Sequence, residues 1–278
     1  MKKYLTTEFD SESPELIHAL DEISLWSAPF GIELLENINY KSGIKVLDIG
    51  FGTGFPLMEL AFRLGDTAKI YGIDTWEEAI KRVKEKIKFH KLTNIQIIKG
   101  GAEAIPLGDE SVNLITSNNG INNVEHIEKV ISECSRILKP GGQFIQTMNL
   151  DGSMIEFYDQ LRTVLDEMGL EKEISLMYQH ITKKRPSLDF ISSLLQKNNF
   201  EIEEIKHHQF NYRFASGTAM LNHYFIRLAF MESWIKLLPT NKVEQIFDRI
   251  ETRLNQIAEK ERGIKLSIPF VLINSVKL

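Results

Sequence analysis

The sequence has one cysteine among its 278 residues, few prolines and no long uncharged apolar run. A lone thiol, Cys134, cannot form an internal disulfide, and it excludes zinc sites built from several cysteines. The most apolar stretch, residues 219–238, is interrupted by Arg227, Glu232 and Lys236, whereas a membrane span needs about 20 nearly uncharged residues. We therefore expect neither a disulfide scaffold nor a membrane span.

The sequence also lacks a surplus of positive charge. Lysine and arginine number 33 against 38 acidic residues, which gives a net charge of −5, and nucleic-acid binders usually carry a basic surplus. The first residues include two lysines but no apolar segment typical of a secretory signal. We therefore expect a cytoplasmic protein without a nucleic-acid partner. Its 43% hydrophobic and 26% charged residues are ordinary for a globular protein of one to two domains.

Short apolar runs alternate with amphipathic segments through the first half of the chain, which is typical of an α/β fold with a parallel sheet. Two further helices, at 14–26 and 28–37, precede the first run. Thr75 and Glu78 are spaced as a capping box, and the KPGG segment at 139–142 is predicted to stop a helix. The predicted strands are 45–50, 69–74, 95–99, 112–117 and 143–150, and the predicted helices between them are 56–64, 77–90 and 124–138.

The second half of the sequence is predicted to be mainly helical. Apolar residues recur on one helical face from Met154 to Met168, and residues 201–214 end in an alternating pattern that indicates a strand. The last strand is predicted at 270–276, because Pro269 has no N–H to donate inside a central strand. The predicted helices of this half are 154–168, 186–198, 218–238 and 241–260.

The most informative segment is Asp48-Ile49-Gly50-Phe51-Gly52-Thr53-Gly54, which joins a buried strand to a helix. Glycines let the backbone turn sharply and approach a ligand closely, and the N-terminus of the helix offers free N–H groups. Asp74 ends the next strand, where a carboxylate can accept hydrogen bonds from the hydroxyls of a ribose. These features predict a pocket for an adenosine-type cofactor at the carboxyl ends of parallel strands.

The glycine spacing distinguishes between cofactors. A dinucleotide fingerprint, G-x-G-x-x-G, would place its third glycine at Phe55 or Leu57. The D-x-G-x-G-x-G spacing instead resembles the first motif of the class I S-adenosylmethionine (SAM)-dependent methyltransferases. Residues 100–107 (GGAEAIPL) and 133–142 (ECSRILKPGG) resemble two further motifs of the ubiquinone/menaquinone-type, or type 11, family. The resemblance covers about residues 45–150.

The resemblance implies a doubly wound, Rossmann-like sheet of seven mostly parallel strands, with an antiparallel last strand and helical cap insertions. It also implies SAM as the cofactor and S-adenosylhomocysteine (SAH) as the product. We expect an N-terminal helical lid at 1–40, a SAM-binding core at 41–150, a helical insertion at 151–185, and the second half of the sheet at 186–278 with a cap insertion at 216–262.

The resemblance further implies which residues contact SAM. The sequence departs from the family at Gly101, where an acidic residue usually contacts adenine, and at Asn123, where a histidine is frequent. The implied contacts are Asp48, Gly50, Gly52 and Gly54 for the methionine part, Asp74 for the ribose, Thr75 and Trp76 beside the adenine, Ala102 and Glu103 at the adenine edge, and Asn118 near the methyl group.

The chemistry of methyl transfer does not require a catalytic dyad. In-line displacement from a sulfonium needs alignment and exclusion of water, and it needs a general base only if the nucleophile carries a proton. The catalytic residues therefore stay unassigned, and the candidates for a base are His126, His180, His223 and Tyr158. The histidines show no metal-ligand spacing, so no metal is expected.

The aromatic residues of the two insertions favour a small apolar or aromatic methyl acceptor. Two alternatives stay open, a methyltransferase that acts on protein or RNA, and a non-catalytic SAM-binding module. A nicotinamide oxidoreductase is disfavoured by the glycine spacing. The oligomeric state is also open, with a homodimer as one alternative. The aromatic residues in question are Phe157, Tyr158, Tyr178, Phe214, Tyr224, Phe225 and Trp234.

Overall fold

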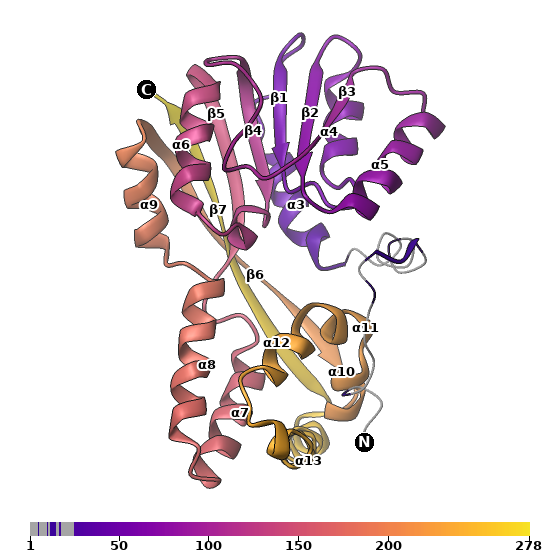
Figure 1. Ribbon diagram of the computed structural model, residues 1–278, viewed down its shortest axis with the longest axis vertical. Coiled ribbons are helices and arrows are strands. Elements are labelled where there is room, and N and C mark those ends of the chain that lie inside the picture. Colours follow the sequence, from indigo (N-terminus) through magenta and orange to yellow (C-terminus); the bar gives the residue numbers. More distant parts are fainter. Residues whose placement is uncertain (1–4, 6–9, 11, 15–16, 18–24) are drawn as a thin grey trace. The chain divides into compact units, whose positions relative to one another are not determined.

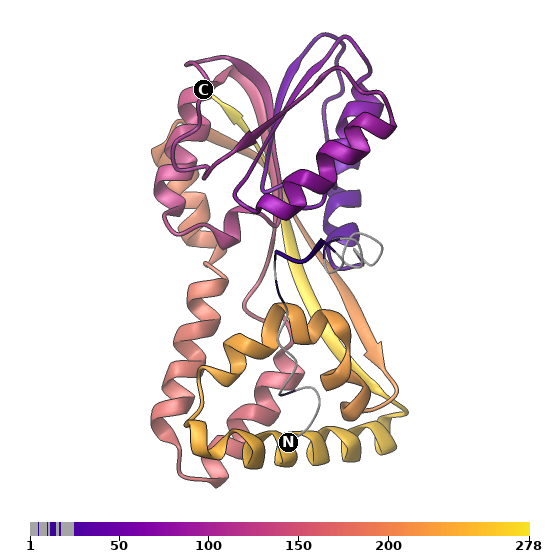
Figure 2. The ribbon, with the colours of Figure 1, turned by 45° about the vertical axis from the view of Figure 1, so that its right-hand side comes forward.

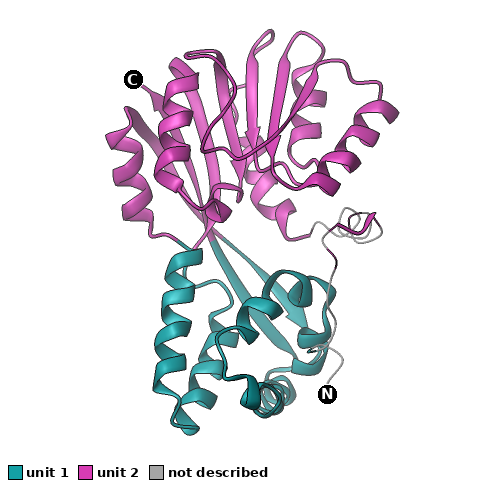
Figure 3. Cartoon of the chain, viewed as in Figure 1, with its two compact units in different colours: residues 1–9, 151–185, 209–269 teal, residues 10–150, 186–208, 270–278 magenta. Residues whose placement is uncertain are grey.

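A computed structural model of the protein describes residues 5, 10, 12–14, 17 and 25–278. The chain divides into two compact units, coloured separately in Figure 3. The sheet unit contains Asp10–Leu150, Pro186–His208 and Phe270–Leu278, and the helical unit contains Asp151–Arg185 and Gln209–Pro269. The helix predicted at 14–26 lies largely outside the described residues.

The sheet has seven strands in the order β3-β2-β1-β4-β5-β7-β6 (Figure 1). The pairings of β1 with β2, β1 with β4, β2 with β3 and β4 with β5 are parallel, and β7 pairs antiparallel with β5. This arrangement confirms the predicted fold class. The strands are β1 (Lys45–Ile49), β2 (Lys69–Asp74), β3 (Ile95–Lys99), β4 (Val112–Asn118), β5 (Leu138–Asn149), β6 (Phe200–Phe214) and β7 (Ile264–Lys277).

Helices cover both faces of the sheet because successive strand residues point to opposite sides. Leu47 of β1 belongs to one core cluster and its neighbour Val46 to the other. On the Leu47 face pack α6 (Ile127–Ile137) and α9 (Leu188–Lys197). On the Val46 face pack α3 (Ser27–Glu36), α4 (Leu57–Leu64) and α5 (Glu77–Phe89). The carboxyl ends of the parallel strands are left free to form a site.

The helical unit is built around stacked aromatic rings. Trp234 stacks on Phe157 with ring centroids 3.7 Å apart, and its Nε1 donates to the hydroxyl of Tyr158 at 3.1 Å. In Figure 2 the long helix α13 is seen lengthwise, and it packs against α7 and α10. The helices are α7 (Ile155–Glu167), α8 (Glu171–Lys184), α10 (Gly217–Asn222), α11 (Tyr224–Ile226), α12 (Glu232–Ile235) and α13 (Val243–Glu261), with a π-helical turn at Arg227–Met231.

Three predicted boundaries are wrong for identifiable reasons. The single helix predicted at 218–238 is broken because His223 is extended, with φ −61° and ψ 131°. The helix before KPGG ends at Ile137, close to the predicted end, but the strand predicted from 143 begins at Leu138, so KPGG lies inside β5, where the register shifts between Val112 and Leu114 of the neighbouring strand. β7 passes through Pro269, whereas its pairing with β5 begins one residue later at Phe270. The missing N–H of the proline therefore costs no bond in that ladder.

Candidate active site

The turn between β1 and α4 contains three glycines with positive φ, and two of them, Gly50 and Gly52, line the cavity described below. Gly50 and Gly52 have φ values of +73° and +52°, a region that side chains other than glycine rarely adopt. The Gly50 N–H donates to the carbonyl of Ile73 at 2.9 Å, which ties the turn to the end of β2. A Cβ on Gly50 would lie 3.0 Å from the Cα of Gly120, whereas a Cβ on Gly52 would meet nothing within 4 Å. The turn is therefore in close contact with Gly120 at Gly50, whereas the space beside Gly52 is open.

Asp74 ends β2 and is fixed by two backbone N–H groups. Its Oδ2 accepts a hydrogen bond from Gly52 and its Oδ1 accepts one from Trp76, each at 2.8 Å. Each carboxylate oxygen has two lone pairs, so both oxygens keep the capacity to accept a further hydrogen bond. The predicted capping box is wrong, because the N-cap of α5 is Trp76, whose side chain makes no capping hydrogen bond, and Glu78 pairs with Lys81 instead.

A cavity of about 440 Å³ lies at the carboxyl ends of β1, β2 and β4. Eight of the ten predicted cofactor contacts line it. Three of its lining residues are acidic, and within the described chain none is lysine, arginine or histidine. The lining residues are Ile49, Gly50, Gly52, Ile73, Asp74, Thr75, Trp76, Gly100, Gly101, Ala102, Glu103, Asn118, Asn119, Gly120, Asn123, Val124 and Glu125.

Two predicted contacts, Asp48 and Gly54, do not line this cavity. Asp48 is fully buried in β1, and its Oδ1 accepts a hydrogen bond from the Thr116 hydroxyl at 2.6 Å. Burial raises the pKa of Asp48 to about 7, and the charge of Asp74 adds to the rise, against the lowering effect of the Thr116 bond. Gly54 faces apolar side chains of the neighbouring helices. Asp48 and Gly54 therefore contribute to the packing around the glycine turn and do not face the cavity.

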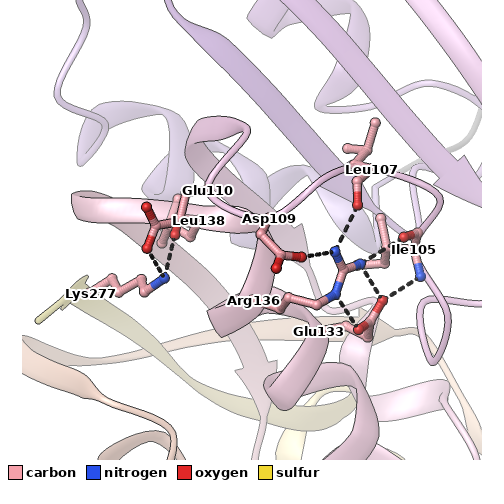
Figure 4. Close-up of polar contacts among 8 residues, drawn as sticks. All are labelled: Ile105, Leu107, Asp109, Glu110, Glu133, Arg136, Leu138 and Lys277. Atoms are coloured by element: carbon pink, nitrogen blue, oxygen red, sulfur yellow. Dashed lines mark hydrogen bonds and ion pairs between the residues drawn. The ribbon is translucent and has the colours of Figure 1, made fainter.

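The loop after β3 is anchored by Glu133 and Arg136, an ion pair within the third sequence motif (residues 133–142), as drawn in Figure 4. Glu133 accepts a hydrogen bond from the N–H of Ile105 at 2.7 Å. Arg136 binds both oxygens of Glu133 and donates to the carbonyls of Ile105 and Leu107 at 2.9 and 2.8 Å. These bonds fix residues 105–107, which closely follow the cavity residues Ala102 and Glu103. The motif thus has a local role in shaping the cavity wall.

Asparagines form a second wall at the end of β4. Asn118 accepts a hydrogen bond from the Thr147 hydroxyl at 3.0 Å and donates to the carbonyl of Ser27 at 3.1 Å. Asn119 has a positive φ of +56°, and its side-chain oxygen accepts from Asn122 at 2.7 Å. Five residues that follow Asn118 also line the cavity and were not predicted from the sequence: Asn119, Gly120, Asn123, Val124 and Glu125. Their position directly after a predicted strand was the available signal.

None of the four candidate bases is among the residues that line the cavity. His126 is exposed and directly follows Glu125 of the cavity wall. His180, His223 and Tyr158 belong to the helical unit, and Tyr158 is buried with its hydroxyl bound to Trp234. The described residues contain no cluster of histidine, cysteine or acidic side chains able to hold a metal. No helix in the described part of the chain is long and apolar enough to cross a membrane.

The cavity fits an adenosyl sulfonium better than a phosphate-bearing cofactor. Its volume of about 440 Å³ lies in the range of small-molecule sites. Asp74, Glu103 and Glu125 give the lining a negative character, which complements a positively charged sulfonium and the hydroxyl donors of a ribose, and which disfavours a pyrophosphate. The open face at Gly52 provides the close backbone approach that a ligand needs.

Comparisons with known proteins agree with this site. Residues 40–198 match the family described as a methyltransferase domain. Demethylmenaquinone methyltransferases of Geobacillus stearothermophilus and Listeria welshimeri are similar, at 27% identity over 64% of this chain and 80% of the relative, and at 29% over 69% and 82%. The solved YcgJ protein of Bacillus subtilis shares the fold, with a TM-score of 0.58 at 17% identity, over 90% of this chain and 98% of that chain.

The chain therefore belongs to the methyltransferase-domain family, and it is a class I SAM-dependent methyltransferase related distantly to the demethylmenaquinone methyltransferases. SAM is its methyl donor and SAH its product. The resemblance drawn from the three sequence motifs is confirmed.

Proposed function

We propose that the protein transfers the methyl group of SAM to a small apolar or aromatic molecule, and that the cavity at the carboxyl ends of β1, β2 and β4 binds SAM. The observation that supports the binding site most directly is Asp74, whose two oxygens are fixed by backbone N–H groups beside the glycine turn. SAM supplies an electrophilic methyl group whose transfer leaves SAH.

The residues of the cavity then have separable roles. Asp74 accepts hydrogen bonds from the ribose hydroxyls through its remaining lone pairs. Gly50 and Gly52 let the methionine part approach the backbone, because neither carries a side chain there. Ala102 and Glu103 border the adenine, with Trp76 and Thr75 beside it. Asn118 lies toward the methyl end, at the close of β4.

The acceptor is proposed to be small for two reasons. The curated relatives described above are named for demethylmenaquinone, a small molecule. The lining of the cavity is acidic in the described chain, which disfavours the phosphates of RNA. We propose that the helical unit selects the acceptor, as the predicted cap insertions imply. Phe157, Tyr158 and Trp234 themselves pack against one another and are fully buried, so they form its core.

Calorimetry tests the donor site. The full chain is titrated with SAH, with SAM and with NAD as the control ligand. We expect SAH and SAM to bind and NAD not to bind. Binding of NAD without either sulfur ligand would overturn the assignment of the cavity.

A mass-spectrometric screen tests the reaction. The protein, SAM and a panel of quinols, phenols and apolar acids are incubated, with a peptide digest and total RNA as further arms. We expect a gain of one methyl group on a small apolar or aromatic compound, in parallel with formation of SAH. Methylation confined to the peptide or RNA arm contradicts the small-molecule proposal, and SAM binding without methylation of any arm favours a non-catalytic binding module.

A further inference from the structure

Arg185 is a charged side chain held almost entirely away from solvent. It directly follows α8 in the helical unit, and its backbone N–H donates to the carbonyl of Ile181 at 3.1 Å. The residue is 4% exposed. Arginine stays charged at any pH that a folded protein meets. The fold therefore contains a permanently buried positive charge at this point.

The guanidinium of Arg185 has unused hydrogen-bond donors. Its Nε and Nη1 atoms are buried and have no hydrogen-bond partner within the described chain. No carboxylate of the described residues forms an ion pair with it, and acids of the same unit are engaged elsewhere. Glu156 binds Ser267, Glu167 pairs with Arg253 at 2.9 Å, and Glu251 accepts from Thr218 at 2.6 Å.

The surroundings of Arg185 are aromatic and positively charged. Its guanidinium carbon lies 5.4 Å from the centre of the Tyr158 ring, a cation–π contact that offsets part of the desolvation cost. Burial, together with the charges of Arg185 and Lys184, lowers the pKa of nearby His180. Neither neighbour supplies the negative charge that a buried guanidinium requires.

We propose that Arg185 binds the anionic group, a carboxylate or phosphate, of a small ligand in the helical unit. A guanidinium presents N–H donors in a planar fork that matches the oxygens of a carboxylate or phosphate. The guanidinium lies over the Tyr158 ring, so Nε and Nη1, which have no partner in the described chain, are the donors available to an anion.

The competing interpretation is that Arg185 is a structural residue that braces Tyr158. The two interpretations differ in their effect on stability. A structural brace loses packing and the cation–π contact when it is replaced, so Arg185→Met would lower the melting temperature. A buried charge that is retained for binding lowers the stability of the ligand-free protein. In that case Arg185→Met would leave the melting temperature unchanged or raise it.

The binding test uses three matched probes, benzoate, phenyl phosphate and neutral benzamide, at millimolar concentration. Thermal shift and calorimetry are measured on the full-length wild type, on Arg185→Met and Arg185→Lys, and on Arg162→Met, which removes an exposed arginine from α7 of the same unit. We expect benzoate or phenyl phosphate to stabilise the wild type and Arg162→Met, and benzamide to have no effect. Arg185→Met should bind the anionic probe at least about tenfold more weakly, and Arg185→Lys should retain part of the binding.

The outcomes separate the two proposals. SAH binding by each protein serves as the reference. If SAH binds but the three probes bind alike or not at all, the Arg185 proposal is overturned and the donor site stands. If the anionic probes bind in an Arg185-dependent way but SAH does not bind, the anion site stands and the donor site is overturned. A lower melting temperature of Arg185→Met with unchanged probe binding assigns Arg185 a structural role.

Discussion

Asp74 and Gly52 are 22 positions apart in the sequence and are joined by a 2.8 Å hydrogen bond from the Gly52 N–H to the Asp74 Oδ2. This bond connects the two features that the sequence motif places on neighbouring strands. It positions the carboxylate at the open side of the glycine turn before any ligand arrives. Preorganisation of this kind reduces the entropy lost on binding.

The first prediction concerns Asp74. We expect Asp74→Ala to weaken SAH binding by about 10- to 100-fold, because it removes both acceptor oxygens, at about 1.5–3 kcal/mol for hydrogen bonds to a charged group. Asp74→Asn keeps one oxygen and should lose less. Calorimetry with SAH gives the affinities, and Asp66→Asn, a change at an exposed site, is the matched control. Equal affinity of wild type and Asp74→Ala would remove the ribose role from Asp74.

The second prediction concerns the pH dependence of stability through Asp48. Burial raises its pKa from 3.8 to about 7 in the folded state, so the unfolded chain loses this proton first as the pH rises. The free energy of unfolding should therefore fall between about pH 4 and pH 7, by on the order of 4 kcal/mol from this group. Asp48→Asn cannot ionise, so its stability relative to the wild type should increase over the same interval and level off above pH 7.

Urea unfolding at several pH values measures this difference. The quantity compared is the free energy of unfolding plotted against pH. A destabilisation caused by the new amide of Asp48→Asn shifts this curve by the same amount at every pH, whereas the ionisation of Asp48 changes its slope. The difference in slope between the two proteins is therefore the diagnostic quantity. Asp66→Asn again controls for the loss of an aspartate at an exposed position. A difference between Asp48→Asn and wild type that is the same at pH 5 and pH 8 contradicts a raised pKa.

The third prediction separates two partners of Arg136. Glu133 is about one-fifth exposed and also holds the Ile105 N–H, whereas Asp109 is 77% exposed. We expect Glu133→Gln to lower the free energy of unfolding by about 1–2 kcal/mol and to weaken SAH binding, because the loop beside Ala102 and Glu103 loses its anchor. Asp109→Asn should change stability by less than about 1 kcal/mol. Chemical unfolding and calorimetry check both; similar effects of the two variants would contradict the anchoring role.

The sequence predicts the site best where function demands a particular backbone. The glycine turn was identified because positive φ at Gly50 and Gly52 restricts the choice of residue. Asp74 was identified because a carboxylate ends the next strand after that turn. The cavity wall beyond Asn118 was missed, because its position depends on long-range bonds, such as that from the Asn149 N–H to the side-chain oxygen of Asn119 at 3.2 Å.

The elements of the sheet were also predicted well, because the period of buried residues differs between strand and helix. The boundaries failed where long-range pairing decides them. β5 extends back to Leu138 because it pairs with Val112 of β4, and Pro269 is tolerated in β7 because the β5 ladder starts at the next residue.

The fourth prediction concerns Gly120, which faces the glycine turn. A Cβ there would lie 2.5 Å from the carbonyl oxygen of Ile49 and 3.2 Å from the Cα of Gly50, so two backbone segments would have to separate. We expect Gly120→Ala to lower the free energy of unfolding by about 1–3 kcal/mol and to weaken SAH binding, because Gly120 and Gly50 both line the cavity. Gly108→Ala is the matched control, since its Cβ would meet nothing within 4 Å. Chemical unfolding and SAH calorimetry measure both effects, and equal behaviour of the two variants would show that the close approach of Gly120 to the turn is not required.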